Sequence, residues 1–134
     1  MKQNKMTVGY TRCAFDDAGI PRSETMEVQQ EDIEVYALVN GYCLGKIYED
    51  SGVSGLSYER NGFVRMMEDA KKGQFVRVLM TEPSRLGRDI SRNMDAVREL
   101  ESLGIEIVYT AADVETAGAL KEVLEFLTEH LHRE

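Results

Sequence analysis

The sequence is poor in the residues that stabilise small domains through cross-links or metal ions. It contains no tryptophan, two cysteines, two histidines and two prolines in 134 residues. Cys13 and Cys43 lie in separate predicted strands rather than in a CxxC pair, and His130 and His132 lie near the C-terminus. This spacing predicts neither a disulfide framework nor a structural zinc site. We therefore expect no structural metal ion.

The sequence also lacks long apolar runs. None approaches the roughly 20 residues that a membrane-spanning helix needs. The N-terminal stretch "MKQNKMTVGY" has no apolar segment of the kind found in a signal peptide. The expected location is therefore the cytoplasm.

Positive charge is scarce as well. Sixteen Lys and Arg residues face 24 Asp and Glu residues, which gives a formal net charge of -8. Proteins that bind DNA by bulk electrostatics neutralise phosphates with Lys and Arg. Any contact with nucleic acid must therefore be local, or depend on another segment.

The remaining composition is that of an ordinary globular protein, with 43% hydrophobic and 30% charged residues. The length fits one domain over residues 1–134. The sequence contains no zinc ribbon, helix-turn-helix or basic tail, so we predict no separate DNA-binding domain.

Short β-rich runs alternate with segments of helical periodicity. The expected strands cover residues 7–13, about 43–48, 75–80 and 105–110, and the expected helices cover residues 23–40, 61–72, 90–103 and about 118–133. In the first helix Ser23 is a candidate N-cap, and Met26, Ile33 and Ala37, with Val28 and Leu38 as further candidates, form the apolar stripe.

This alternation predicts a three-layer α/β fold. We expect a mainly parallel sheet of four to five strands with helices on both faces. Ligands of such sheets bind outside the carboxyl ends of the strands. The segments "RCAFDD", "EDSGVSGLSYER" and "EPSRLGRD" follow the first three strands, so their polar residues should lie at one edge.

Four arginines are expected at this edge: Arg12, Arg60, Arg85 and Arg88. Strand alternation places Arg12 and residue 14 on one side of the first strand and Cys13 on the other. A guanidinium group grips phosphate oxygens bidentately and stays charged at any relevant pH. If these arginines converge, they predict an anion site. The alternative interpretation, which applies to each arginine considered alone, is a solvated surface residue.

The runs "YTRCA", "YEDSGVSGLSYERNGF" and "SRLGRD" appear in this order with helices between them. From Val8 to about Arg133 the chain resembles the catalytic domain of the serine recombinases, the resolvase/invertase family, and especially its large-serine-recombinase and transposon-type branch. The segment "SETMEVQQ", which contains Gln29, is similar to the helix that follows the nucleophile loop in that family.

The resemblance implies site-specific DNA recombination without a metal, a nucleotide energy source or any other cofactor. A serine near the end of the first strand attacks a DNA phosphodiester and forms a 5′-phosphoserine. The partners it implies are the scissile phosphate of DNA and further copies of the chain, in a homodimer or tetramer of the full-length protein. The last helix is available for dimer contact, or alternatively closes onto its own domain.

The family pattern is carried over residue by residue. The matching positions are Tyr10, Arg12, Asp50, Ser54, Gly55, Arg60, Arg85 and Arg88. Two positions depart from it, because Ala14 occupies the nucleophile position and Ser84 stands where an acidic residue is expected. Asp50 has a second interpretation as a turn residue bonded to nearby backbone N–H groups, and Ser54-Gly55 is also ordinary loop sequence.

Three explanations for Ala14 compete. An engineered serine-to-alanine change accounts for Ala14 but not for Ser84. Relocation of the nucleophile to Thr11, Cys13 or Ser84 conflicts with strand alternation for the first two. Natural decay into a non-cleaving relative accounts for both departures and is the explanation we favour.

The sequence therefore predicts a serine recombinase catalytic domain that does not cleave as written. The alternative is a naturally inactive relative that oligomerises with an active recombinase or regulates it. A phosphate-sensing α/β domain unrelated to recombination is a third hypothesis.

Overall fold

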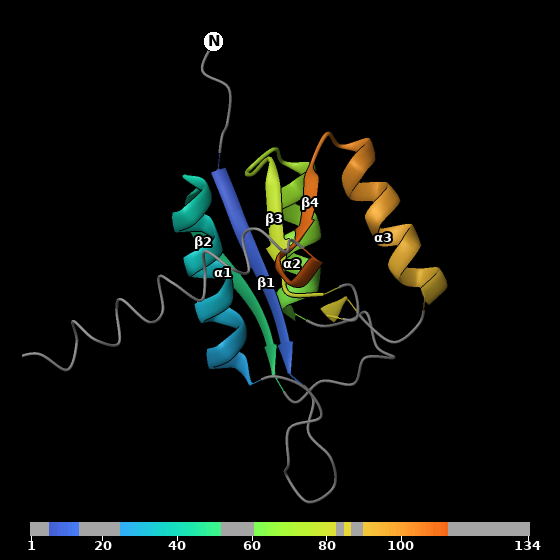
Figure 1. Ribbon diagram of the computed structural model, residues 1–134. Coiled ribbons are helices and arrows are strands. Elements are labelled where there is room, and N and C mark those ends of the chain that lie inside the picture. The colour runs from blue at the N-terminus through green and yellow to red at the C-terminus, as the bar shows by residue number, and fades with distance from the viewer. Residues whose placement is uncertain (1–5, 14–24, 52–60, 83–84, 87–89, 113–134) are drawn as a thin grey trace, which may run out of the picture.

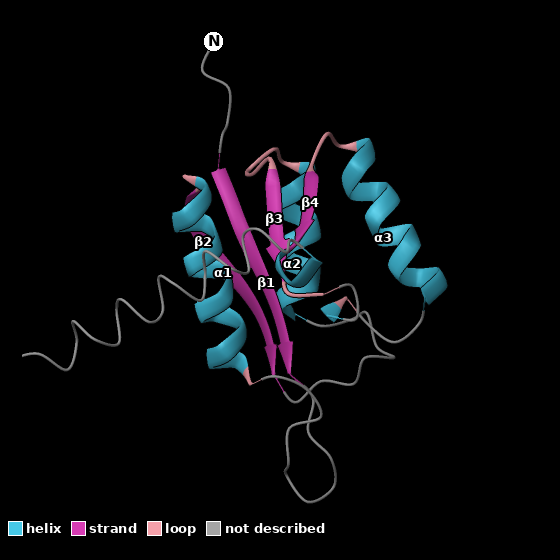
Figure 2. Cartoon of the chain, viewed as in Figure 1, coloured by secondary structure: helices cyan, strands magenta, loops and turns pink. Residues whose placement is uncertain are grey.

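The computed structural model describes residues 6–13, 25–51, 61–82, 85–86 and 90–112. Its strands are β1 (Met6–Cys13), β2 (Cys43–Ser51), β3 (Arg77–Met80) and β4 (Glu106–Tyr109). They form one sheet in the order β2-β1-β3-β4, and every neighbouring pair is parallel (Figure 2). The predicted parallel sheet is confirmed, and the described residues supply these four strands without a fifth.

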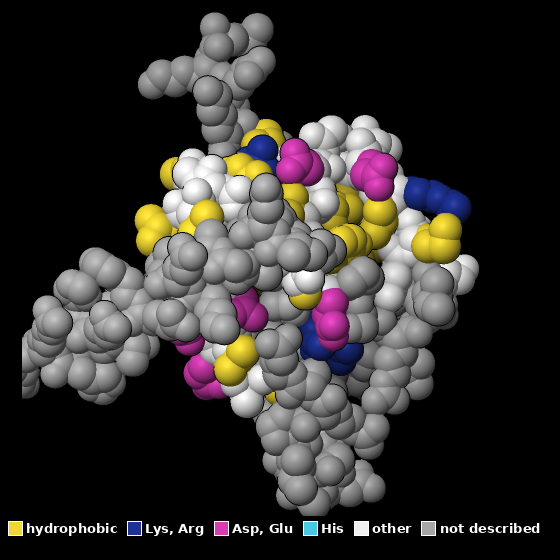
Figure 3. Space-filling view, in the orientation of Figure 1, with side chains coloured by type: hydrophobic (Ala, Val, Ile, Leu, Met, Phe, Trp, Pro, Cys, Tyr) yellow, Lys and Arg dark blue, Asp and Glu magenta, His cyan; other side chains and the backbone are white. Residues whose placement is uncertain are grey.

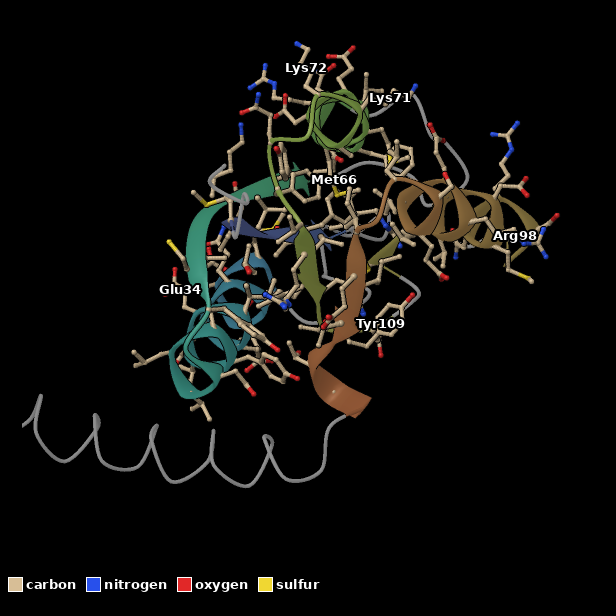
Figure 4. The ribbon with its side chains drawn as sticks, turned by 90° about the horizontal axis from the view of Figure 1, so that it is seen from above. Glu34, Met66, Lys71, Lys72, Arg98 and Tyr109 are labelled. Atoms are coloured by element: carbon tan, nitrogen blue, oxygen red, sulfur yellow. The ribbon has the colours of Figure 1, made fainter. Side chains whose placement is uncertain are left out.

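Helices cover both faces of the sheet. They are α1 (Met26–Asn40), α2 (Asn61–Lys71) and α3 (Ile90–Ser102), and a short 3-10 helix (Thr110–Ala112) follows β4. Helix α1 lies on one face, and α2 and α3 lie on the other (Figures 1 and 4). The three-layer fold is therefore confirmed, whereas the helix expected over residues 118–133 lies outside the described residues.

Two buried clusters separate the layers. The larger one joins Tyr10 of β1 to Met66 of α2 and Leu100 of α3, and Met66 points from its helix toward the sheet in Figure 4. The smaller cluster joins Ile33 of α1 to the sheet. Because side chains alternate along β1, the even-numbered residues face α2 and α3, and the odd-numbered residues face α1.

Helix α1 begins and ends with standard capping geometry. Thr25, rather than Ser23, is its N-cap, and Thr25 Oγ1 accepts a hydrogen bond from Val28 N at 3.4 Å. Gly41 ends the helix in the left-handed region with φ of 70°, and Tyr42 N donates to Ala37 O at 2.8 Å. The stop signal predicted at Asn40-Gly41 is confirmed.

The buried stripe of α1 differs from the prediction in three members. Ile33 and Ala37 are buried as expected, but Met26 is only half-buried, and Val28 and Leu38 are 42% and 69% exposed. The sheet is covered instead by the face that contains Gln29, which is fully buried. The assignment failed because a buried polar residue occupies a position where periodicity alone favours an apolar one.

Helix α2 matches its prediction, because Phe63, Met66, Met67 and Ala70 are all buried. Strand β2 is longer than predicted and pairs with β1 as far as Ser51. Asp50 therefore belongs to a strand rather than to the loop. Tertiary pairing with β1 supplies the hydrogen bonds that extend β2 beyond its apolar residues.

Candidate functional site

The carboxyl edge of the sheet brings three of the predicted site residues together. Arg12 and Asp50 are paired across β1 and β2, and Arg85 lies in the connection that follows β3. All three are buried, with 6%, 5% and 5% of their surfaces exposed. Buried charged groups of this kind require partners.

Arg12 and Arg85 bind each other's backbone. Arg12 Nε donates to the carbonyl oxygen of Arg85 at 3.1 Å. Arg85 Nη1 donates to the carbonyl oxygen of Arg12 at 3.3 Å. This reciprocal contact holds the end of β1 against the segment after β3. It places two permanent positive charges side by side, an arrangement that an anion stabilises.

Of the two other nitrogens of the Arg85 guanidinium, Nη2 has a partner and Nε has none among the described residues. Its Nη2 forms an ion pair with Glu82, whose side chain is 45% exposed. Arg85 Nε is buried and has no hydrogen-bond partner among the described residues. A buried donor without a partner costs about 1–3 kcal/mol, so this nitrogen favours an incoming acceptor.

Gln29 fixes the backbone of Arg12 from the α1 side. Its Nε2 donates to Arg12 O at 3.0 Å, and its Oε1 accepts from Arg12 N at 3.2 Å. Gln29 was a candidate because of the family resemblance, and the structure shows that its side chain contacts the backbone of Arg12. Because Arg12 O also accepts from Arg85, Gln29 and Arg85 use both lone pairs of one carbonyl oxygen.

Asp50 binds the start of α2 and a tyrosine of β1. Its carboxylate accepts hydrogen bonds from Gly62 N and Phe63 N, each at 2.9 Å, and from Tyr10 Oη at 2.8 Å. These bonds agree with the interpretation of Asp50 as a residue that binds nearby backbone N–H groups. A carboxylate is stabilised at a helix N-terminus, so Asp50 links β1, β2 and α2.

Gly62 permits this close approach. A Cβ at Gly62 would lie 2.5 Å from Glu49 O and 2.9 Å from Asp50 Oδ2. Only glycine therefore fits without a shift of the backbone. The residue lies next to the candidate site, and the sequence pattern did not single it out.

Thr11 and Cys13 lie on the opposite face of the sheet from the Arg12 side chain. Both are buried, with 0% and 1% of their surfaces exposed. Thr11 Oγ1 is bonded to Tyr48 O at 3.5 Å. Neither side chain shares a surface with the arginine pair, which agrees with the expectation from strand alternation.

Six predicted site positions lie outside the described residues: Ala14, Ser54, Gly55, Arg60, Ser84 and Arg88. The expected convergence of four arginines is therefore seen for Arg12 and Arg85. The structure adds Glu82, which the motif analysis did not select. Its spacing of three residues before Arg85 was the available indication.

The surroundings of this edge are mixed in charge. On the face drawn in Figure 3, the described residues form no continuous basic patch, and acidic side chains lie among apolar ones.

The His, Cys, Asp and Glu residues within the described ranges do not form a group of three able to hold a metal. Within the same ranges, every helix is too short or too polar to cross a membrane.

One of the comparisons with known proteins identifies a family for this chain. The family model "Resolvase, N terminal domain" matches residues 7–133. No curated protein sequence matches the chain significantly.

Solved structures with the same fold include three proteins described as recombinases or integrases. The N-terminal catalytic domain of TP901-1 integrase has a TM-score of 0.70 at 20% identity, over 96% of this chain and 100% of that one. The catalytic domain of ISC1926 TnpA, an IS607-like serine recombinase, has a TM-score of 0.66 at 20% identity, over 93% and 82% of the two chains. A resolvase family site-specific recombinase from Streptococcus pneumoniae has a TM-score of 0.66 at 24% identity, over 94% and 89%. Because the family model spans nearly the whole sequence, this chain belongs to the resolvase family, as a resolvase N-terminal domain.

Proposed function

We propose that this chain is a serine recombinase catalytic domain that holds a DNA phosphodiester on Arg12 and Arg85. The observation that carries the proposal is the reciprocal arginine pair, with Arg85 Nε buried and unpartnered among the described residues. A phosphate oxygen satisfies that nitrogen and neutralises both charges. The grip is local, so it is compatible with a net charge of -8.

In this proposal the arginines supply the electrostatic part of strand transfer. With a serine at position 14, the hydroxyl loses its proton to a base, its oxygen bonds to phosphorus, and the DNA 3′-oxygen leaves and takes up a proton. Guanidinium groups stabilise the charge that develops on the phosphoryl oxygens. The reverse attack by the 3′-hydroxyl rejoins the DNA, and the energy of the bond is kept in the phosphoserine.

Ala14 has no hydroxyl, so we infer that this chain binds the phosphate without cleaving it. The other proposed residues of the site are Ser54, Gly55, Arg60 and Arg88, with Tyr10, Asp50 and Gln29 as supporting residues. In the full-length context the chain acts in the cytoplasm as a homodimer or tetramer on DNA.

The test is restoration of covalent chemistry. Ala14→Ser, alone and with Ser84→Asp, is joined to a DNA-binding segment and incubated with a duplex that carries the matching site. We expect a protein–DNA adduct that survives denaturing electrophoresis, and no adduct when Arg85→Gln is added. A folded Ala14→Ser/Ser84→Asp protein that forms no adduct contradicts the proposal.

The second candidate is a naturally inactive relative that assembles with an active recombinase. It is favoured by the joint departure of Ala14 and Ser84 from the family pattern. Sedimentation of the chain alone and mixed with an active family member tests this candidate. A strictly monomeric chain in both experiments eliminates it.

A further inference from the structure

Glu82 lies beside the nitrogen edge that a phosphate requires. A guanidinium group binds a phosphate bidentately through two parallel N–H groups on neighbouring nitrogens. Nη1 is already bonded to Arg12 O at 3.3 Å. The edge formed by Nε and Nη2 is the bidentate pair that contains the nitrogen without a partner among the described residues.

Glu82 contacts the Nη2 end of that edge. Its Oε1 contacts Nη2, and Nε is left buried without a partner among the described residues. The two side chains differ in exposure, because Arg85 is 6% exposed and Glu82 is 45% exposed. Arg85 is therefore buried in place, whereas the Glu82 side chain is partly exposed to solvent.

We propose that Glu82 competes with the DNA phosphate for Arg85 and must leave Nη2 before the phosphate binds bidentately. This inference rests on the proposed function. In the unbound protein the carboxylate neutralises one of two adjacent guanidinium groups and keeps the pair together. When the phosphate arrives, two anions contend for one nitrogen, and their mutual repulsion lowers the affinity.

The consequence is a higher affinity threshold, because any phosphate that takes up the Nε–Nη2 edge must first displace Glu82. A phosphodiester presented alone must displace Glu82. A phosphodiester that additional DNA contacts already hold in place is present at the same nitrogen at a high local concentration. Glu82 thereby suppresses occupation of the arginine pair by free phosphate.

The variant Glu82→Gln tests the competition, because glutamine keeps the shape and removes the negative charge. The probes are inorganic phosphate and a duplex of about 20 base pairs, titrated against the full chain by calorimetry and by NMR of the arginine Nε–H resonances. We expect Glu82→Gln to bind both probes about five- to tenfold more tightly, the order expected for removal of one like charge at contact distance in a partly exposed site.

A matched control separates competition from net charge. Glu106→Gln removes a carboxylate that pairs with Arg77 at 3.3 Å near the opposite edge of the sheet, so it changes the net charge by the same amount. It should leave both affinities within about twofold, since Glu106 lies beside Arg77 at the start of β3 and β4, whereas Glu82 and Arg85 follow the end of β3, and solvent ions screen exposed charges that are well separated. Equal gains in the two variants overturn the inference.

A second background tests whether the effect passes through Arg85. Arg85→Lys keeps the positive charge and loses the two parallel N–H groups. In that background Glu82→Gln should improve binding no more than Glu106→Gln does. The same five- to tenfold gain in the lysine background overturns the inference, because the effect is then general repulsion rather than competition for the guanidinium edge.

The outcomes distinguish this inference from the function on which it rests. If the wild type binds the probes and Glu82→Gln binds them no more tightly than Glu106→Gln does, the role of Glu82 is overturned and the proposed phosphate grip is not. Absence of binding in both the wild type and Glu82→Gln overturns the proposed phosphate grip together with it. Thermal unfolding followed by circular dichroism verifies that each variant is folded.

Discussion

The side-chain amide of Gln29 forms hydrogen bonds with both backbone groups of Arg12, at 3.0 Å to its carbonyl oxygen and 3.2 Å from its N–H. A neighbouring β-strand likewise accepts a hydrogen bond from a residue's N–H and donates one to a carbonyl oxygen. One buried side chain of α1 thus continues the pairing of β1 at the point where the site begins. The position of the Arg12 guanidinium depends on this contact.

Gln29→Leu is therefore expected to affect both stability and binding. Leucine fills a similar volume but leaves the N–H of Arg12 without this partner, so the free energy of unfolding should fall by about 1–3 kcal/mol. Phosphate affinity should fall as well, because the end of β1 is no longer fixed. Urea unfolding and phosphate titration measure the two effects.

The adjacent Gln30 provides the control for that prediction. Its amide contacts Glu49 at the exposed surface, so Gln30→Leu should change the free energy of unfolding by less than about 0.5 kcal/mol. Equal losses for the two variants would mean that the Gln29 amide has no special role.

Gly62→Ala should strongly destabilise the fold beside the site. The new Cβ would lie 2.5 Å from the backbone oxygen of Glu49, which has no flexible end that moves away. We expect a loss of about 2–3 kcal/mol in the free energy of unfolding, at the upper range of overpacking effects. Val64→Ala, at a 39% exposed position of the same helix, serves as comparison, and a loss of similar size there would contradict the steric explanation.

Asp69 should make stability dependent on acid pH. A hydrogen bond from Tyr48 Oη to Asp69 Oδ2 at 2.6 Å, assisted by Lys46, lowers the pKa of Asp69 below its ordinary value of 3.8. A carboxyl whose pKa is lowered on folding contributes stability above its unfolded pKa and loses it as the pH falls through the folded pKa. The contribution is therefore complete at neutral pH and disappears below the lowered value.

The measurement compares variants across that range. Between about pH 6 and about pH 2, the excess stability of the wild type over Asp69→Asn should shrink progressively. Tyr48→Phe removes the principal cause of the shift, so its stability should fall less steeply with acid than that of the wild type. Parallel acid profiles for the wild type and Tyr48→Phe would refute the assignment.

The two cysteines should differ in reactivity. Cys43 is exposed at the start of β2, whereas Cys13 is buried at the end of β1. A water-soluble disulfide reagent should modify Cys43 rapidly in the folded protein and Cys13 only after unfolding, because buried thiols are shielded from reagent. Rapid modification of Cys13 in the folded state would restore it as a candidate for a relocated nucleophile.

Local sequence was sufficient for the elements whose signals are local. The apolar spacing of Phe63, Met66 and Met67 identified α2 and its buried face, and Asn40-Gly41 identified the end of α1. The alternation of strands and helices, together with right-handed crossovers, predicted the parallel sheet and the edge at which Arg12 and Arg85 meet. These features follow from periodicity and from backbone conformations that few residues adopt.

Other assignments required tertiary contacts. Val28 and Leu38 fit a helical stripe but are exposed, since α1 presents Gln29 to the sheet instead. Asp50 was expected in a loop, and pairing with β1 places it in β2. Such choices depend on which hydrogen bonds a distant strand offers, and no local pattern contains that information.

The sequence by itself determined the family pattern, the absence of a hydroxyl at position 14 and the presence of arginines at the end of β1 and in the segment after β3. Only the tertiary structure decided how the described arginines are arranged. Arg12 and Arg85 donate hydrogen bonds to each other's carbonyl oxygens, and Glu82 forms an ion pair with Nη2 of Arg85. The physical reason is that residue identity specifies charge and donor number, whereas the direction of each N–H is set by backbone groups that are distant in sequence and adjacent only in the folded chain.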